Sequence, residues 1–325
     1  MSPDLNAAFA PLQAAIDAGR IPGGVLGVIR ADGTRTVRAH GRAQIVPHAR
    51  AMSRGTWFDL ASLTKVLFTT PWILDLAKEG VINLDDPLTR LLPDLRQYHA
   101  DAWERAVTFR QCLGHQTPFP AVEPIYTYGR DPQLLRAFIL QREWRAGSPV
   151  YSDINFILLG FALERHYRKT LRDLYPGDGF AWSAPPGLSA ATEDCTWRNR
   201  VLSGEVHDDN CSALQGAGHA GLFGTADAIL TRAHALLTAP PDLNRAPLSA
   251  TRTHGWERAH PGWSGGDRTS PETIGQTGFT GTGLWIDFAR GHAWTLLTNR
   301  IHPTRHFDSG IAALRRAVGD AVSGD

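Results

Sequence analysis

The chain has 325 residues, of which 42% are hydrophobic and 20% are charged, and its 33 basic and 32 acidic side chains leave a net charge of +1. These fractions are ordinary for a globular protein and exclude the collagen-like, disordered and disulfide-scaffold classes. The balanced charge gives no indication of a nucleic-acid or membrane partner. Only three of the 33 basic residues are lysine, at positions 65, 78 and 169.

Both ends of the chain have the pattern of a helix packed beside strands. Apolar residues recur at helical spacing over residues 4–18, and Gly19 ends that pattern. Two strands are predicted at 23–29 and 34–39, joined by Asp32-Gly33, a pair that suits the positive φ of a tight turn. Near the other end, strands are predicted at 283–288 and 293–298, and a helix at 311–318.

The middle of the chain is mainly helical by the same criteria. Helices are predicted at 62–79, 136–140, 155–166 and 170–174, separated by clusters of Pro and Gly. We therefore expect an α/β (α+β) fold with a discontinuous domain, formed by residues 1–60 and 212–325. A mainly helical domain of residues 61–211 is expected to be inserted into it. Ligands often bind in a cleft between two such parts, so we expect the active site there.

Several features favour a cytoplasmic protein. The first residues lack the basic and apolar regions of a secretory signal, and no apolar run approaches the roughly 18 residues that span a bilayer. The three cysteines, Cys112, Cys195 and Cys211, are odd in number and show no C-x-x-C spacing. Free thiols in a reducing compartment are therefore expected.

The most specific local signal is the pair Ser62 and Lys65 at the start of the first long interior helix. A spacing of three puts both side chains on one helical face. Serine needs a neighbouring base to act as a nucleophile, and a lysine can serve when its surroundings allow it to give up a proton. Arginine cannot, because it does not deprotonate. The alternative is a serine at a helix start and a solvated lysine.

Five blocks in the same order resemble one superfamily. They are residues 58–65 (FDLASLTK), 107–117 (VTFRQCLGHQT), 151–160 (YSDINFILLG), 218–225 (GHAGLFGT) and 276–281 (QTGFTG). Together they resemble the serine β-lactamase and penicillin-binding-protein superfamily, in its class C-like branch, which also holds esterases and D-amino-acid peptidases. The resemblance implies the β-lactamase/DD-peptidase-like fold, an antiparallel sheet flanked by terminal helices with an inserted helical domain.

The resemblance also implies roles for individual residues. Ser62 is the implied nucleophile, Lys65 helps to take its proton, and Tyr151 is the base or the proton shuttle to the leaving group. Gln276, Thr277 and Gly278 occupy the family's Lys-Thr-Gly position. Thr277 is expected to hydrogen-bond substrate, and Gly278 to let the acyl group pass close to the backbone. The N–H groups of Ser62 and Phe279 are expected to form the oxyanion hole.

Two residues depart from the family pattern. Gln276 replaces a lysine whose charge helps to recognise a substrate carboxylate, which weakens the case for a β-lactamase and favours esters or small amides. Asp153 replaces the usual Asn. A carboxylate beside Lys65 stabilises the ammonium form, so our hypothesis is that Tyr151 carries more of the base role and that Lys65 and Asp153 form an electrostatic pair.

We therefore predict a serine hydrolase that acts through an acyl-enzyme on a carboxylic ester or a small amide. The alternatives are a D-amino-acid or cell-wall-fragment peptidase, a weak β-lactamase, and a penicillin-binding-like protein that is acylated without turnover. No metal and no organic cofactor is implied. The expected partner is a small-molecule or peptide substrate, with no nucleic acid and no membrane, and the sequence leaves the oligomeric state open.

Two histidine-containing segments suggest possible metal ligands, but we interpret neither as a metal site. His207, Asp208, Asp209 and His219 fit no compact zinc spacing, so we expect a polar loop whose groups satisfy one another. Residues 302–306 contain two histidines around Pro303, which interrupts a helical face, and we predict a surface turn there.

Overall fold

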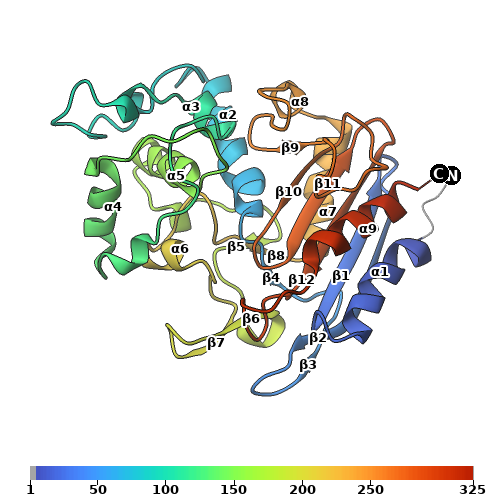
Figure 1. Ribbon diagram of the computed structural model, residues 1–325. Helices are drawn as coiled ribbons and strands as arrows, with labels where there is room; N and C mark the ends of the chain where they lie inside the picture. Colours follow the sequence, from blue (N-terminus) through green and yellow to red (C-terminus); the bar gives the residue numbers. More distant parts are fainter. Residues whose placement is uncertain (1–4, 325) are drawn as a thin grey trace.

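A computed structural model describes residues 5–324 (Figure 1). Its main element is a seven-stranded sheet with the strand order β3-β2-β1-β12-β11-β10-β9, so strands from the two ends of the chain meet in its centre. The strands of this sheet are β1 (Gly23–Arg30), β2 (Arg35–Gln44), β3 (Arg50–Ala51), β9 (Glu257–Arg258), β10 (Ile274–Thr277), β11 (Thr282–Asp287) and β12 (His292–Thr298).

The central pairings are antiparallel and continuous. Strand β1 pairs with β12 from Gly24 opposite Thr298 to Arg30 opposite His292. Strands β10 and β11 form a hairpin in which Thr277 lies opposite Gly283. This register places the residues after Thr277 at the end of the sheet beside the first residues of the helical region.

Helices cover both faces of the sheet (Figure 1). Helices α1 (Leu5–Asp17) and α9 (Ile311–Val322) pack against each other on one face, and α7 (Ala226–Thr238) packs against β1 and β12 on the other. Residues of β1 alternate between the two cores, since Val25 and Ile29 lie in the larger apolar cluster and Leu26 and Val28 in the smaller. This period of two is expected of a strand buried on both faces.

The region between β4 and β8 is mainly helical. It contains α2 (Thr70–Lys78), α3 (Phe109–Leu113), α4 (Pro132–Gln141), α5 (Asp153–Tyr167) and α6 (Asp209–Ala213), and a further helix α8 (Asp242–Arg245) follows α7. Short strands form two smaller sheets, β4 (Phe58–Asp59), β8 (Phe223–Gly224) and β5 (Phe180–Ala181) in one, β6 (Ala191–Cys195) and β7 (Arg200–Ser203) in the other. Helix α5 is buried from Ile154 to Leu163, which makes it the centre of this region.

The expected α/β fold is confirmed, and several predicted elements need correction. The predicted first helix begins at Asp4, which lies outside the described residues. Residues 62–79 do not form one α-helix, because a π-helical segment (Lys65–Thr69) precedes α2. Residues 170–174 form only a short 3₁₀ turn, and α7 was not predicted. The proposed division into residues 1–60 with 212–325 and residues 61–211 remains a prediction.

Within residues 5–324, no helix combines the length and the apolar composition that crossing a bilayer requires.

Candidate active site

The segment around Ser62 is held by a buried carboxylate. Asp59 is the last residue of the short strand β4, and its side chain accepts hydrogen bonds from the N–H of Ala61 at 2.8 Å and of His207 at 2.6 Å. Burial raises the pKa of the Asp59 carboxyl. Ala61 adopts a φ of 47°, a strained conformation for a residue with a side chain. The local turn therefore projects Ser62 just before the helix instead of within it.

Lys65 lies on the first turn after Ser62 and is fully buried. Its Nζ donates to Ser62 Oγ at 2.9 Å, to Asp153 Oδ1 at 2.8 Å and to the His219 carbonyl at 3.3 Å. Burial disfavours the ammonium, but Asp153 and Tyr151 outweigh it, so the pKa of Lys65 lies above its ordinary value. The lysine is therefore an ammonium that donates to the serine hydroxyl oxygen.

Tyr151 comes from the turn that precedes α5. The Lys65 Nζ lies 4.9 Å from the centre of its ring, and Gln276 Nε2 donates to its hydroxyl oxygen at 2.9 Å. The His115 ring packs against it with 4.3 Å between ring centres. Burial, together with the charges of Arg252 and Lys65, holds the pKa of His115 well below its ordinary value, so this imidazole is neutral.

The turn after β10 is fastened directly to the serine segment. Thr280 Oγ1 donates to the Asp59 carbonyl at 2.8 Å, and Thr282 Oγ1 donates to the Leu60 carbonyl at 3.0 Å. A Cβ on Gly278 would lie 2.6 Å from the Leu60 carbonyl oxygen, so only glycine fits there. The expected reason for this glycine was passage of the acyl group, whereas the contact present is with the protein backbone.

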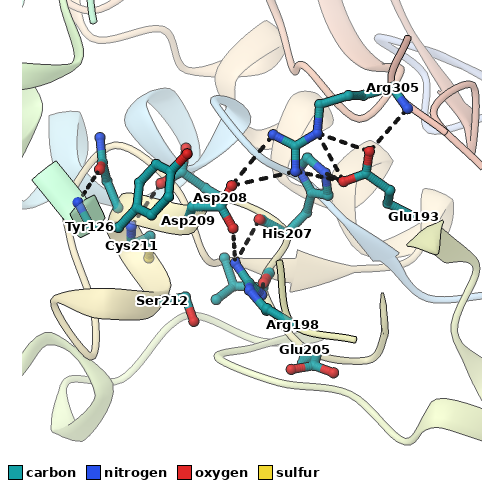
Figure 2. Close-up of polar contacts among 12 residues, drawn as sticks. Tyr126, Glu193, Arg198, Glu205, His207, Asp208, Asp209, Cys211, Ser212 and Arg305 are labelled. Atoms are coloured by element: carbon teal, nitrogen blue, oxygen red, sulfur yellow. Dashed lines mark hydrogen bonds and ion pairs between the residues drawn. The ribbon is translucent and has the colours of Figure 1, made fainter. Parts of the chain in front are cut away.

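Phe279, in the same turn, lies over a buried polar network. Its ring stacks on the His207 ring, and it is 51% exposed. Figure 2 shows Glu193 between His207 and Arg305, and Arg198 beside Asp209. Burial disfavours the charge on Glu193, but His207 and Arg305 outweigh it and hold the pKa of Glu193 below its ordinary value. The network therefore contacts the turn after β10 through the stacking of the His207 ring on the Phe279 ring.

Residues 302–306 form turns and bends in which Thr304 and His306 are exposed, in line with the predicted surface turn, but two of the side chains make contacts that the prediction lacks. Arg305 forms ion pairs with Glu193 and Asp209. His302 is buried and accepts hydrogen bonds from the N–H groups of Ile45 and Val46. Sequence spacing could not indicate these partners, because Glu193 is more than a hundred positions away.

Three potential metal-ligating side chains come together beside Lys65. Asp153, Asp208 and His219 offer ligand atoms within 4.8 Å of one another. Asp153 already accepts from Lys65, and Asp208 Oδ1 accepts from His219 Nε2 at 2.8 Å and from the Cys211 N–H at 2.7 Å. Burial disfavours the charge on Asp208, but His219 and Cys211 hold its pKa below the ordinary value. Both carboxylates are therefore already hydrogen-bonded within the protein, although His219 Nδ1 is buried without a partner, and the buried ammonium opposes a further cation.

The structure brings most of the predicted site residues together. Ser62, Lys65 and Asp153 form one hydrogen-bonded chain, and Tyr151 and Gln276 form a second beside it. Thr277 ends β10 and leads into Gly278 and Phe279. Within residues 5–324, the backbone N–H groups of Ser62 and Phe279 donate to no other residue. The sequence prediction missed Asp59, His115 and Arg252; Asp59 and His115 lie in blocks that resemble the superfamily, and Arg252 does not.

Comparisons with known proteins agree with this arrangement. The Beta-lactamase family matches residues 5–318. The chain is 27% identical to the N-acetylmuramyl-L-alanine amidase of Bacillus subtilis (strain 168), over 86% of this chain and 78% of that protein. It is also 27% identical to a protein of Salmonella agona (strain SL483) provisionally named a D-alanyl-D-alanine carboxypeptidase, over 79% of this chain and 72% of that protein.

A solved structure of similar fold is that of EstCE1, described as a hydrolase with promiscuous acyltransferase activity. It superposes with a TM-score of 0.72 at 20% identity and covers 98% of both chains. The family match spans nearly all of the described residues. The chain therefore belongs to the Beta-lactamase family of serine hydrolases.

Proposed function

We propose that the protein hydrolyses a carboxylic ester or a small amide through an acyl-enzyme on Ser62. One observation carries the proposal: the buried Lys65 ammonium donates to Ser62 Oγ at 2.9 Å and is held by Asp153 at 2.8 Å. A serine hydroxyl beside a fixed charge, at a strained turn, is the arrangement of an activated nucleophile. An amidase among the relatives and a hydrolase with promiscuous acyltransferase activity among the similar structures support acyl transfer from an ester or amide substrate.

In the acylation step, Ser62 Oγ attacks the carbonyl carbon and loses its proton. The Lys65 ammonium stabilises the negative charge that develops on Oγ. Tyr151 acts as a proton shuttle: its oxygen accepts the Ser62 proton, directly or by way of Lys65, which passes on one of its own, while the Tyr151 hydroxyl proton goes to the leaving group as the carbonyl–leaving-group bond breaks. The N–H groups of Ser62 and Phe279 receive the carbonyl oxygen when it becomes an oxyanion. Water then attacks the acyl-enzyme and releases the acid.

The same site also suits a peptidase for D-amino-acid or cell-wall fragments. The provisional carboxypeptidase among the relatives favours this second candidate. Gln276 argues against efficient β-lactam hydrolysis, because a neutral amide that donates to Tyr151 supplies no charge for a substrate carboxylate. A cytoplasmic location, supported by three buried free thiols, is part of the proposal.

A labelling experiment tests the serine. Wild type, Ser62→Ala and the control Ser148→Ala, an exposed serine, are treated with a fluorophosphonate probe and weighed intact. Wild type and Ser148→Ala are expected to gain one adduct and to hydrolyse p-nitrophenyl acetate, while Ser62→Ala does neither. Turnover of nitrocefin and D-alanine release from a D-Ala-D-Ala peptide separate the lactam and peptidase alternatives. A Ser62→Ala protein that labels and hydrolyses like wild type contradicts the proposal.

A further inference from the structure

An arginine with no role in the acylation step lies against the Tyr151 ring. The guanidinium carbon of Arg252 is 5.1 Å from the centre of that ring. The side chain is half-buried. Its charge contributes to the lowered pKa of His115, whose ring packs on Tyr151. Arg252 therefore adds positive potential at the side of the site where Tyr151 protonates the leaving group.

Within residues 5–324, Arg252 has no carboxylate partner. Its Nη1 atom is buried and donates to no acceptor. Glu257, which lies opposite Arg252 in an isolated β-bridge, is occupied by His260 at 3.1 Å and Ser264 at 3.0 Å. A buried guanidinium nitrogen without an acceptor costs folding free energy, because its lost hydration is not replaced. Arg252 differs in this respect from Arg245, which forms an ion pair with Glu272.

The backbone fixes Arg252 in this position. Its carbonyl accepts from the N–H of Leu248 at 2.8 Å and of Ser249 at 3.1 Å. The same loop is tied to the segment that carries His115, because Gln116 Nε2 donates to the Leu248 carbonyl and the Gly255 N–H donates to Leu113. The backbone of Arg252 is thus held in place before any substrate binds, which limits the ordering cost of binding to that of its side chain.

The other charges near Tyr151 leave Arg252 as the uncompensated one. Lys65 is neutralised by Asp153 at 2.8 Å. Gln276, at the position where related lactam-handling proteins carry a lysine, is neutral and donates to Tyr151. Within residues 5–324, an anion that enters beside Tyr151 therefore meets Arg252 as a cation without a carboxylate partner, and its guanidinium presents a planar set of donors that matches a carboxylate.

We propose that Arg252 binds a carboxylate carried by the leaving group, so that the preferred substrates are esters or amides whose leaving group is an anion. This inference rests on the proposed hydrolase function. A leaving group with a free carboxylate, such as the C-terminal residue of a peptide or a hydroxy acid, places its charge on the Tyr151 side while its ester or amide carbonyl faces Ser62.

Two esters that differ only in charge test the inference. The acetate ester of 3-hydroxybenzoate carries a carboxylate on its leaving group, and the acetate ester of methyl 3-hydroxybenzoate does not. In wild type, kcat/KM is expected to be at least tenfold higher for the anionic ester. Arg252→Gln is expected to reduce that ratio about ten- to a hundredfold, and Arg252→Lys to retain part of it. Arg245→Gln, which removes a paired and exposed arginine, keeps the wild-type ratio.

The outcomes separate the inference from the proposed function. Ser62-dependent hydrolysis of both esters with no preference, or with a preference unchanged in Arg252→Gln, overturns the role of Arg252 and leaves the hydrolase intact. If neither ester is hydrolysed, the hydrolase proposal fails for these esters, and binding of 3-hydroxybenzoate to Ser62→Ala by calorimetry still tests Arg252. Loss of that binding in Ser62→Ala/Arg252→Gln supports the role, and equal binding overturns it. Thermal unfolding of each variant reports on its folding.

Discussion

The substitution Lys65→Arg keeps the positive charge and removes the amine, so it tests whether the charge alone is sufficient for catalysis. The Lys65 Nζ makes three hydrogen bonds in a fully buried position, to Ser62, to Asp153 and to the His219 carbonyl. A guanidinium is larger and planar, so it cannot place one nitrogen at the meeting point of these three acceptors. It also cannot give up a proton during the reaction.

The expected magnitude follows from these contacts. A positioned group that transfers or stabilises a proton contributes about 10²- to 10⁴-fold to the rate. We therefore expect Lys65→Arg to lower kcat/KM for p-nitrophenyl acetate about a thousandfold, which corresponds to roughly 4 kcal/mol of transition-state stabilisation. Lys78→Arg and Lys169→Arg are the matched controls, because both lysines are exposed, and they are expected to stay within about twofold of wild type.

The assay compares steady-state rates of the four proteins at equal, active-site-titrated concentration. Thermal unfolding of Lys65→Arg distinguishes lost chemistry from lost folding, since a folded protein that still reacts slowly with the fluorophosphonate probe isolates the chemical role. The reasoning is refuted if folded Lys65→Arg hydrolyses the ester within about threefold of wild type.

Two further changes test the charges around the site. Asp153→Asn removes the carboxylate that keeps the pKa of Lys65 raised, so the buried ammonium loses its proton at lower pH. The alkaline limb of the pH profile of kcat/KM is therefore expected to shift to lower pH. An unchanged profile counts against the Lys65–Asp153 pair. Arg305→Gln removes the guanidinium that forms an ion pair with the buried Glu193 carboxylate. It is expected to lower the free energy of unfolding, measured in urea at pH 7, by about 2 kcal/mol. Because Arg305 helps to keep the pKa of Glu193 below its ordinary 4.5, this loss is full above pH 4.5 and shrinks only as the pH falls toward the lowered value. A loss that grows as the pH falls from 7 contradicts the linkage.

The parts of the fold that the sequence predicts are those with a clear local period. The strands around residues 23–29 and 293–298 alternate between two apolar cores, and Asp32-Gly33 marks the turn from the first of them into β2, so these elements can be recognised from the local sequence alone. Helix α7 was missed, although Thr225 caps its first turn by accepting from the Ala228 N–H at 3.3 Å. Its buried side chains have helical spacing, so the signal was present in the sequence and the prediction overlooked it; they are Ala226, Ile229, Leu230, Ala233, Leu236 and Leu237.

The residues of the candidate site likewise fall into two groups, those that local sequence spacing brings together and those that meet only in the fold. Ser62 and Lys65 are three residues apart, so helical geometry alone brings them together. Tyr151, Asp153 and Gln276 come from distant segments, and only the order of the resembling blocks indicates that they meet. The π-helical segment Lys65–Thr69 has no sequence signature of its own, and it begins at Lys65, whose buried side chain contacts Ser62, Asp153 and the His219 carbonyl.

The use of lysine and arginine explains why one functional cation is visible in the sequence and another is not. With only three lysines among 33 basic residues, Lys65 stands out because arginine cannot replace it chemically. Arginine is common in this chain, so the residue type at position 252 does not indicate that Arg252 has a function. What distinguishes it is that it lies against Tyr151 without a carboxylate partner, while arginines such as Arg110 and Arg245 are paired. Pairing is a property of the folded chain, so this candidate for substrate recognition becomes identifiable only when every neighbouring carboxylate is assigned.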